Sequence, residues 1–464
     1  MRSTALTAGA VLAFALSVTA AAYKAVAGTA PGISGITGIV GTVGAAGMAQ
    51  AVASPEHPLL AVSCVSSKHC VAVGYDEAAH GGHGGPLTET WNGHGWAAAA
   101  LKLPVGALGG SLSGVSCKSQ KSCFAVGDYL LPNTPPESDN TGTLAERWNG
   151  KAWAVARPPV PAGATSAALS GVSCVTPADC VATGVYTRAD GTSAALAELW
   201  NGHGWANVLV KLPAGSAGGD LFGVSCASSK SCVAVGSYGN ADFEIVALAE
   251  SWNGKTWRAS EPSAPAGASE AALQGVSCVS AAGCVAVGWY DNAAGYPLGL
   301  AESWNGRKWT KLLLPKSGGY GQLFGVSCVS SKYCLAVGVG DGSAPVTAKG
   351  TPSSAVWNGK SWSYKKVPVP PKGGGSTATS MLQGAQCLSV TDCVAVGQLE
   401  LGNDEQDQYG FWGFWTGKTW QLAAAAGLPP AHEPGIRRAL MTDSGWRGAP
   451  RGPRPGSGAA GRAS

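Results

Sequence analysis

The feature that most constrains the fold is a sequence unit that recurs seven times between Leu59 and Leu428, at steps of 50 to 59 residues. The unit reads Leu, x, Gly-Val-Ser-Cys, five residues, Cys-Val-Ala-Val-Gly, a variable stretch, Leu-Ala-Glu-x-Trp-Asn-Gly, two residues and Trp, with small variations between copies. Self-similarity at a nearly fixed period indicates a repeat architecture, in which each copy is one structural unit packed on its neighbours.

Cysteines occur only in this unit, as one pair six positions apart in every copy. In an exported chain, cysteines in an even set at fixed spacing indicate disulfides, whereas zinc favours pairs two to four residues apart. Because the same spacing recurs seven times, we expect each pair to close within its own copy, at the turn between the first two strands. The pairs are Cys64 and Cys70, Cys117 and Cys123, Cys174 and Cys180, Cys226 and Cys232, Cys278 and Cys284, Cys328 and Cys334, and Cys387 and Cys393.

Short segments rich in Val and aromatic residues lie between Gly, Asn, Ser and Pro in each copy, a pattern typical of strands. Two Trp five positions apart mark the third and fourth strands, and Asn-Gly follows the first Trp in six copies. Four strands per repeat without helical periodicity predict an all-β fold. We expect this fold to be a seven-bladed β-propeller of four-stranded antiparallel blades, with one disulfide inside each blade.

Asn-Gly is a strong signal for a two-residue hairpin turn. With such a turn at Asn253-Gly254, Trp252 faces Lys255 and Glu250 faces Trp257 across the strands. A Glu at the position of Glu250 occurs in five copies. One interpretation is structural: the buried carboxylate accepts a hydrogen bond from an indole or from a backbone N–H of the next blade. The other is a ring of carboxylates that act as catalysts or ligands.

The unit resembles the kelch and galactose-oxidase class of propellers, in which a strand ends at Gly, a variable loop follows, and spaced aromatic residues mark the third and fourth strands. It departs from kelch in having one Gly where kelch usually has two, and in its cysteine pair. The segment SWNGKTW at 251–257 is also similar to the Asp-box of sialidase-like propellers, but it is one residue shorter and lacks the Asp. The Tyr and His copper ligands of galactose oxidase have no match here, so that activity is not expected.

The ends of the chain differ from the repeats. An apolar run from Ala5 to Ala22 after Arg2 predicts a secretory signal peptide at 1–27, with an uncleaved membrane anchor as the alternative. Residues 28–58 form a Gly-rich linker, 59–428 the propeller, and 429–464 a disordered basic tail with six Arg. We therefore expect a protein that is secreted or associated with the cell envelope, without stable membrane insertion after signal cleavage.

The net charge of +4 comes from that tail, because the residues before it hold 25 basic and 25 acidic side chains. A balanced body argues against a basic nucleic-acid stripe, and we expect no nucleic-acid partner. We also expect a monomer.

Any binding surface is expected where strands two and three, and successive blades, are connected, because these connections vary in length on a rigid scaffold. The candidates follow the Gly that ends strand two. Aromatic rings beside carboxylates suit a sugar or a peptide, although the recurring Tyr is also consistent with packing between blades. The ligand-binding candidates are Tyr75, Asp76, Asp128, Tyr129, Tyr186, Tyr238, Trp289, Tyr290, Asp291 and Asp341.

Metal sites have little support in the sequence. Glu400, Asn403, Asp404, Glu405 and Asp407 form an oxygen-rich run that suits calcium, but a solvated loop explains it as well. His80 and His83 lack an evident third ligand. We predict no metal and no cofactor.

Sequence motifs of common enzymes, such as GxSxG, HExxH and the P-loop, do not occur. The leading hypothesis is a secreted binding module, with a glycan or a protein as its ligand and no assigned catalytic residue. A carbohydrate-active hydrolase or lyase that uses Asp76, Asp128, Asp291 and Asp341 is the alternative. A purely structural envelope protein is a third hypothesis, since fold alone does not choose among functions.

Overall fold

The structure, a computed structural model, describes residues 57–77, 79, 83–132, 140–315, 321–340, 350–369, 379–400 and 408–424. The predicted signal peptide, nearly all of the linker and the basic tail lie outside these residues. So do Asp341, His80 and the acidic run from Asn403 to Asp407.

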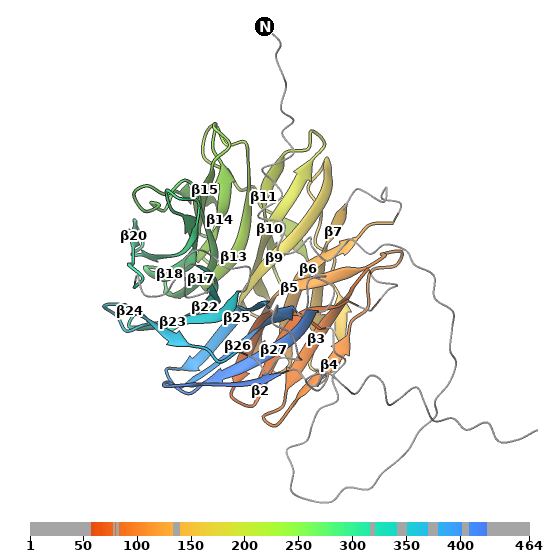
Figure 1. The fold of residues 1–464 in the computed structure, drawn as a ribbon. Coiled ribbons are helices and arrows are strands. Elements are labelled where there is room, and N and C mark those ends of the chain that lie inside the picture. Colours follow the sequence, from red (N-terminus) through yellow and green to blue (C-terminus); the bar gives the residue numbers. More distant parts are fainter. Residues whose placement is uncertain are drawn as a thin grey trace, which may run out of the picture.

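The described chain forms seven four-stranded antiparallel sheets, each made of four strands consecutive in sequence. The expected all-β seven-bladed propeller is thereby confirmed, and Figure 1 shows the blades arranged around a centre. The blades are β1 (Leu59–Ser66), β2 (His69–Asp76), β3 (Gly85–Trp91), β4 (Trp96–Ala100); β5 (Gly110–Ser119), β6 (Ser122–Leu130), β7 (Thr141–Trp148), β8 (Trp153–Val155); β9 (Ala164–Thr176), β10 (Asp179–Arg188), β11 (Ser193–Trp200), β12 (Trp205–Asn207); β13 (Gly218–Ser228), β14 (Ser231–Gly239), β15 (Ile245–Trp252), β16 (Trp257–Ser260); β17 (Ala271–Ser280), β18 (Gly283–Asp291), β19 (Pro297–Trp304), β20 (Trp309–Lys311); β21 (Gly321–Ser330), β22 (Tyr333–Gly340), β23 (Thr351–Trp357), β24 (Trp362–Lys366); and β25 (Thr379–Ser389), β26 (Asp392–Glu400), β27 (Gln408–Trp415), β28 (Trp420–Ala424).

The ring is closed. The first strand of each blade packs against the first strands of both neighbours, and β1 of blade 1 packs against β25 of blade 7 as well as against β5. No strand is exchanged between the first and last blades, so closure depends on packing between complete sheets.

Each predicted disulfide is present inside its own blade, between the first and second strands. The cysteines face each other directly in the register, as Cys226 and Cys232 do, with Cα atoms 3.9 to 4.0 Å apart in all seven pairs. Each bridge closes one hairpin, for which the loop-entropy estimate gives about 2 kcal/mol.

The expected two-residue turn between the third and fourth strands is wrong. Trp252 faces Trp257, not Lys255, and Glu250 faces Ala259, so four residues form the turn. The side chain of Asn253 explains the difference, because its Oδ1 accepts hydrogen bonds from the N–H groups of Lys255 and Thr256 at 2.9 and 3.0 Å. The two Trp of every blade consequently pack against each other with their rings tilted by 39 to 52° and ring centroids 5.3 to 5.7 Å apart.

A β-bulge in the first strand of each blade explains why the Cys-Val-Ala-Val-Gly segment of the second strand ends in Gly. In blade 4 the extra residue is Phe222, because Leu221 pairs with Gly236 and Gly223 pairs with Val235. The bulge brings the carbonyl of Asp220 so close to Gly236 that a Cβ there would collide with its oxygen. The same collision would occur at the equivalent Gly of all seven blades, so only Gly fits this position.

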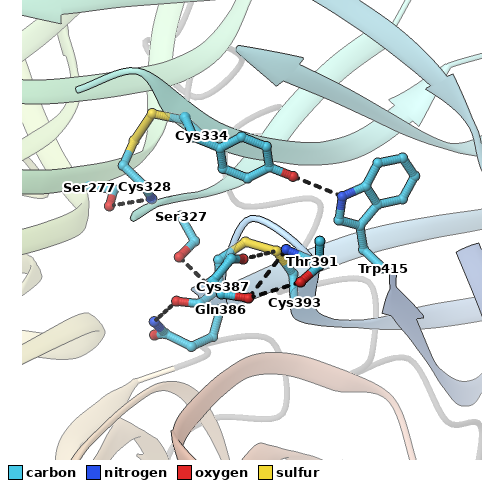
Figure 2. Close-up of a disulfide and its surroundings, with 11 residues drawn as sticks. Ser277, Ser327, Cys328, Cys334, Gln386, Cys387, Thr391, Cys393 and Trp415 are labelled. Atoms are coloured by element: carbon cyan, nitrogen blue, oxygen red, sulfur yellow. Dashed lines mark hydrogen bonds between the residues drawn. A yellow bond between two sulfur atoms is a disulfide. The ribbon is translucent and has the colours of Figure 1, made fainter. Parts of the chain in front are cut away.

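Serines of the Gly-Val-Ser-Cys motif join the blades. The Oγ of each Ser accepts a hydrogen bond from the N–H of the first Cys in the next blade, as Ser277 does from Cys328 and Ser327 from Cys387 (Figure 2). Six joints carry this bond at 2.9 to 3.0 Å. Blade 7 has Gln386 in place of the Ser, and its amide donates to the carbonyl of Cys387 instead.

The joint between blades 7 and 1 is closed by aromatic rings instead. Trp412 of β27 stands where the other six copies have Ala, Ser or Thr, and Phe414 stands where none of them has an aromatic residue, as at Ala301 and Ser303. The ring of Trp412 lies 5.6 Å from Trp91 and 6.0 Å from Trp96, and Phe414 lies 5.3 Å from Trp91. We call Trp91, Trp96, Trp412 and Phe414 the closing cluster.

Candidate functional site

The propeller has two faces of different construction. The turns between strands one and two and between strands three and four lie on one side, which we call the turn face. The connections between strands two and three, and from each blade to the next, lie on the opposite side, which we call the loop face. The described chain begins and ends on the loop face, at His57 and Ala424.

Candidate tyrosines at the loop face are packed between blades. Tyr238 is buried, and Tyr129, Tyr186 and Tyr290 are half-buried against the apolar contacts between adjacent blades. The guanidinium of Arg188 lies over the Tyr186 ring at 5.6 Å.

Tyr75 spans the joint between blades 1 and 7. Its hydroxyl donates a hydrogen bond to Oε1 of Gln408, on β27, at 2.9 Å. The neighbouring Asp76 places a carboxylate oxygen 3.5 Å from Nε2 of the buried His57. Tyr75 therefore joins the first and last blades at the loop face, whereas Asp76 contacts the segment that leads into β1 of its own blade.

Two more candidate carboxyl groups are partly shielded from water. Burial raises the pKa of Asp128 to about 6, against the opposing effect of a 2.9 Å hydrogen bond from the hydroxyl of Ser111. Burial also raises the pKa of Asp291, which follows Trp289 and Tyr290 at the end of β18. The described candidates contact their own blade or an adjacent one.

A small depression lies between blades 5 and 6. Gly299, Gly321, Gln322, Leu323, Val339, Ser353 and Tyr364 line it, and its volume is about 190 Å³ including its open mouth. Gln322, Ser353 and Tyr364 contribute polar side chains to the lining, next to Gly299 and Gly321. Burial, then the nearby Tyr290, raise the pKa of Tyr364. The enclosed part of the depression admits about one water molecule, so it is a shallow hollow that can contact one polar group of a ligand.

The sequence contains no signal for the residues of this depression, because they belong to five different strands and share no motif. The sequence also did not indicate Asp220, on the first strand of blade 4. Burial raises the pKa of Asp220 to about 6. A hydrogen bond with the side chain of Ser193 in blade 3 acts in the opposite direction and lowers this pKa. The sequence candidates all follow the Gly that ends strand two. Asp220 lies on the first strand, before that Gly, so it was not among them.

The five repeated glutamates lie inside the blades, at 0 to 2% exposure. They are Glu89, Glu146, Glu198, Glu250 and Glu302. The expected hydrogen-bond partners are wrong for three of them: neither carboxyl oxygen of Glu198, Glu250 or Glu302 has one, and the nearby indole N–H of Trp257 has none either. Burial raises their pKa values to about 7 for Glu89, Glu146 and Glu302 and about 8 for Glu198 and Glu250. At neutral pH the carboxyl groups of Glu198 and Glu250 are therefore mostly protonated, and those of the other three are about half protonated.

These raised pKa values predict that the protein loses stability as the pH rises. The folded state binds protons that the unfolded chain releases near pH 4.5, so this stability is complete below pH 4.5 and lost as the pH passes about 7 to 8. We expect Glu250→Gln to reduce the fall in the free energy of unfolding between pH 5 and pH 8, by about 1 kcal/mol or more. Urea unfolding at both pH values measures it. The exposed Asp242→Asn serves as the control, and an unchanged fall in Glu250→Gln contradicts the prediction.

Within the described ranges, no group of three or more His, Cys, Asp or Glu side chains is placed to hold a metal ion. The same ranges contain no helix with the length and apolar character needed to cross a membrane.

Similar folds occur among solved structures, whereas no protein-family model and no curated protein matches the chain. YCF48 bound to D1 peptide has a TM-score of 0.45 at 13% identity, over 75% of this chain and 90% of that one. The fucose-specific lectin from Aleuria aurantia has 0.38 at 13% identity, over 81% and 97%. A Trypanosoma rangeli sialidase has 0.41 at 10% identity, over 77% and 53%. These likenesses are too distant to indicate a ligand or an activity for this chain.

Proposed function

We propose that the chain is a binding module that acts outside the cytoplasm and recognises a glycan or a protein through its loop face. The main support for the proposal is the depression between blades 5 and 6. Its lining combines the polar side chains of Gln322, Ser353 and Tyr364 with two glycines, Gly299 and Gly321. Seven disulfides support a site of action outside the cytoplasm, because such bonds persist in oxidising compartments. The more specific resemblance to the kelch class stays a prediction.

The depression suits a small polar group better than a large apolar ligand. Gln322 offers both a donor and an acceptor, and the hydroxyl of Ser353 offers the same. Tyr290 and Asp291 lie at the end of β18, which pairs with the strand of Gly299, so they are placed to contact a larger ligand around the same opening. A sugar hydroxyl or a peptide amide matches these groups.

The proposal is tested with a glycan and peptide array probed with the full chain, followed by measurement of the dissociation constant of the strongest ligand. We expect Gln322→Ala to weaken that ligand by about tenfold, since the loss of one hydrogen bond to a buried group costs about 1 to 3 kcal/mol. Gln120→Ala removes the same side chain from the exposed turn face and should leave affinity unchanged. Equal affinity for both variants and the parent contradicts a site at the depression.

A carbohydrate-active enzyme is the second candidate, and one observation favours it. Asp128 holds a partly shielded carboxyl group with a pKa raised to about 6, and such perturbed groups occur often at catalytic sites. Release of reducing sugar from the array glycans distinguishes the two functions. Turnover that is lost in Asp128→Asn supports the enzyme, and binding without turnover supports the module.

A further inference from the structure

The structure separates charges that balance in the sequence. The turn face consists of fourteen hairpin tips, two in each blade, and all of them lie within the described residues. These tips hold ten Lys and Arg against two Asp, Asp179 and Asp392. The ten are Lys68, Lys121, Lys151, Lys230, Lys255, Arg307, Lys308, Lys332, Lys360 and Lys418, and all are exposed.

The opposite face has the reverse balance. Eighteen Asp and Glu lie in the described ranges; apart from Asp179, Asp392 and the five buried Glu, the remaining eleven lie toward the loop face, together with seven Lys and Arg. Within the described ranges, the exposed charges therefore divide into a basic turn face and a more acidic loop face.

The basic side chains form two concentric circles. Tips between strands one and two surround the centre, and tips between strands three and four lie outside them, since the first strands form the innermost ring. Every blade except blade 3 contributes at least one Lys or Arg. The indole N–H of Trp252 donates to the carbonyl of Ser229 at 3.1 Å, and equivalent bonds join the two tips in three other blades. The circles are therefore held in fixed positions.

Three of the ten large apolar side chains that are exposed in the described residues lie on the same face, and the other seven lie on the loop face. Val279 is 39% exposed, Leu388 37% and Val390 45%, and each lies in or beside a hairpin tip. Lysines around scattered apolar side chains are the composition of surfaces that bind the interface of anionic bilayers. The flanking segments join the propeller at the loop face, so neither attachment point lies on the turn face.

We propose that the turn face is a docking surface for an anionic lipid bilayer. A plane touches both circles of basic side chains at once, whereas a linear polyanion would follow one arc and leave the others unused. Each Lys near an anionic bilayer contributes about 1 kcal/mol, which corresponds to about a fivefold change in affinity. Docking in this orientation leaves the loop face turned away from the bilayer and open to its ligand.

The test measures binding of the full chain to phosphatidylglycerol–phosphatidylcholine vesicles and to pure phosphatidylcholine vesicles. We expect binding only to the anionic vesicles, and we expect it to weaken as salt is added. The triple variant Lys255→Gln, Lys360→Gln and Lys418→Gln should bind on the order of a hundredfold more weakly. Its matched control changes three exposed lysines of the loop face, Lys102→Gln, Lys211→Gln and Lys366→Gln, and should bind as the parent does.

Both triple variants are also prepared in a chain whose six Arg between residues 429 and 464 are replaced by Gln, so that the tail does not conceal the result. Equal losses in the two triple variants, or no vesicle binding by the parent, overturn the proposal. Stronger binding to heparin or to DNA than to anionic vesicles also overturns it, since the face then recognises a linear polyanion. Array binding in the triple variants is a separate readout of the loop face.

Discussion

Replacing Gly236 by Ala is expected to lower the free energy of unfolding by more than about 3 kcal/mol, or to prevent folding. The new Cβ would meet the carbonyl oxygen of Asp220, which the bulge at Phe222 fixes in the adjacent strand. Backbone relieves such a clash less easily than a side chain does, so the loss should lie at or above the upper end of the 1–3 kcal/mol typical of overpacking. Urea unfolding measures the change.

Gly204→Ala is the matched control, because a Cβ at Gly204 would have nothing within 4 Å. We expect its stability to stay within about 0.5 kcal/mol of the parent, as for most exposed substitutions. Similar stabilities for the two variants would contradict the bulge and the close approach that it creates.

The double variant Trp412→Ala and Phe414→Ser is expected to lose about 3 kcal/mol or more and to open the ring between blades 7 and 1. These substitutions introduce the residues of blade 5, Ala301 and Ser303, and remove two rings of the closing cluster. This joint has no Ser-to-Cys hydrogen bond to compensate, since Gln386 replaces the Ser. Hydrogen exchange should therefore rise most in β1 and β27.

Phe124→Val provides the control at another joint. Phe124 is 1% exposed, lies 5.1 Å from Trp200 and stands where five copies have Val and one has Leu, so its loss should destabilise the protein comparably. Exchange should then rise at the joint between blades 2 and 3. If hydrogen exchange of β1 and β27 rises in the Phe124→Val variant as much as in the double variant, the closing cluster has no specific role in closing the ring.

The sequence predicted the features that recur in every copy. The strands, the cysteine pairing and the number of blades follow from signals repeated seven times, so one ambiguous copy does not change the conclusion. Asn253-Gly254 predicted a hairpin but not its length, because Asn-Gly favours two-residue turns and the capping by the Asn side chain also stabilises a four-residue turn.

Features that depend on a neighbouring blade were not predictable in the same way. Trp412 and Phe414 read as departures from the repeat, and their meaning emerges only when β27 is placed beside Trp91 and Trp96. The depression beside Gln322 likewise joins strands from two blades. The basic turn face was present in the sequence, as Lys after Ser-Ser or Asn-Gly, but a count over the whole body concealed it.

The central claim is that the seven repeats form the seven blades of one closed ring, and that a disulfide links the first two strands within each blade. The most direct measurement is mass spectrometry of peptides from the unreduced protein, cleaved between the cysteines of successive copies. The account predicts seven linked pairs, each joining cysteines six positions apart, such as Cys226 with Cys232. Bridges between different copies, or free thiols in the folded protein, would contradict it.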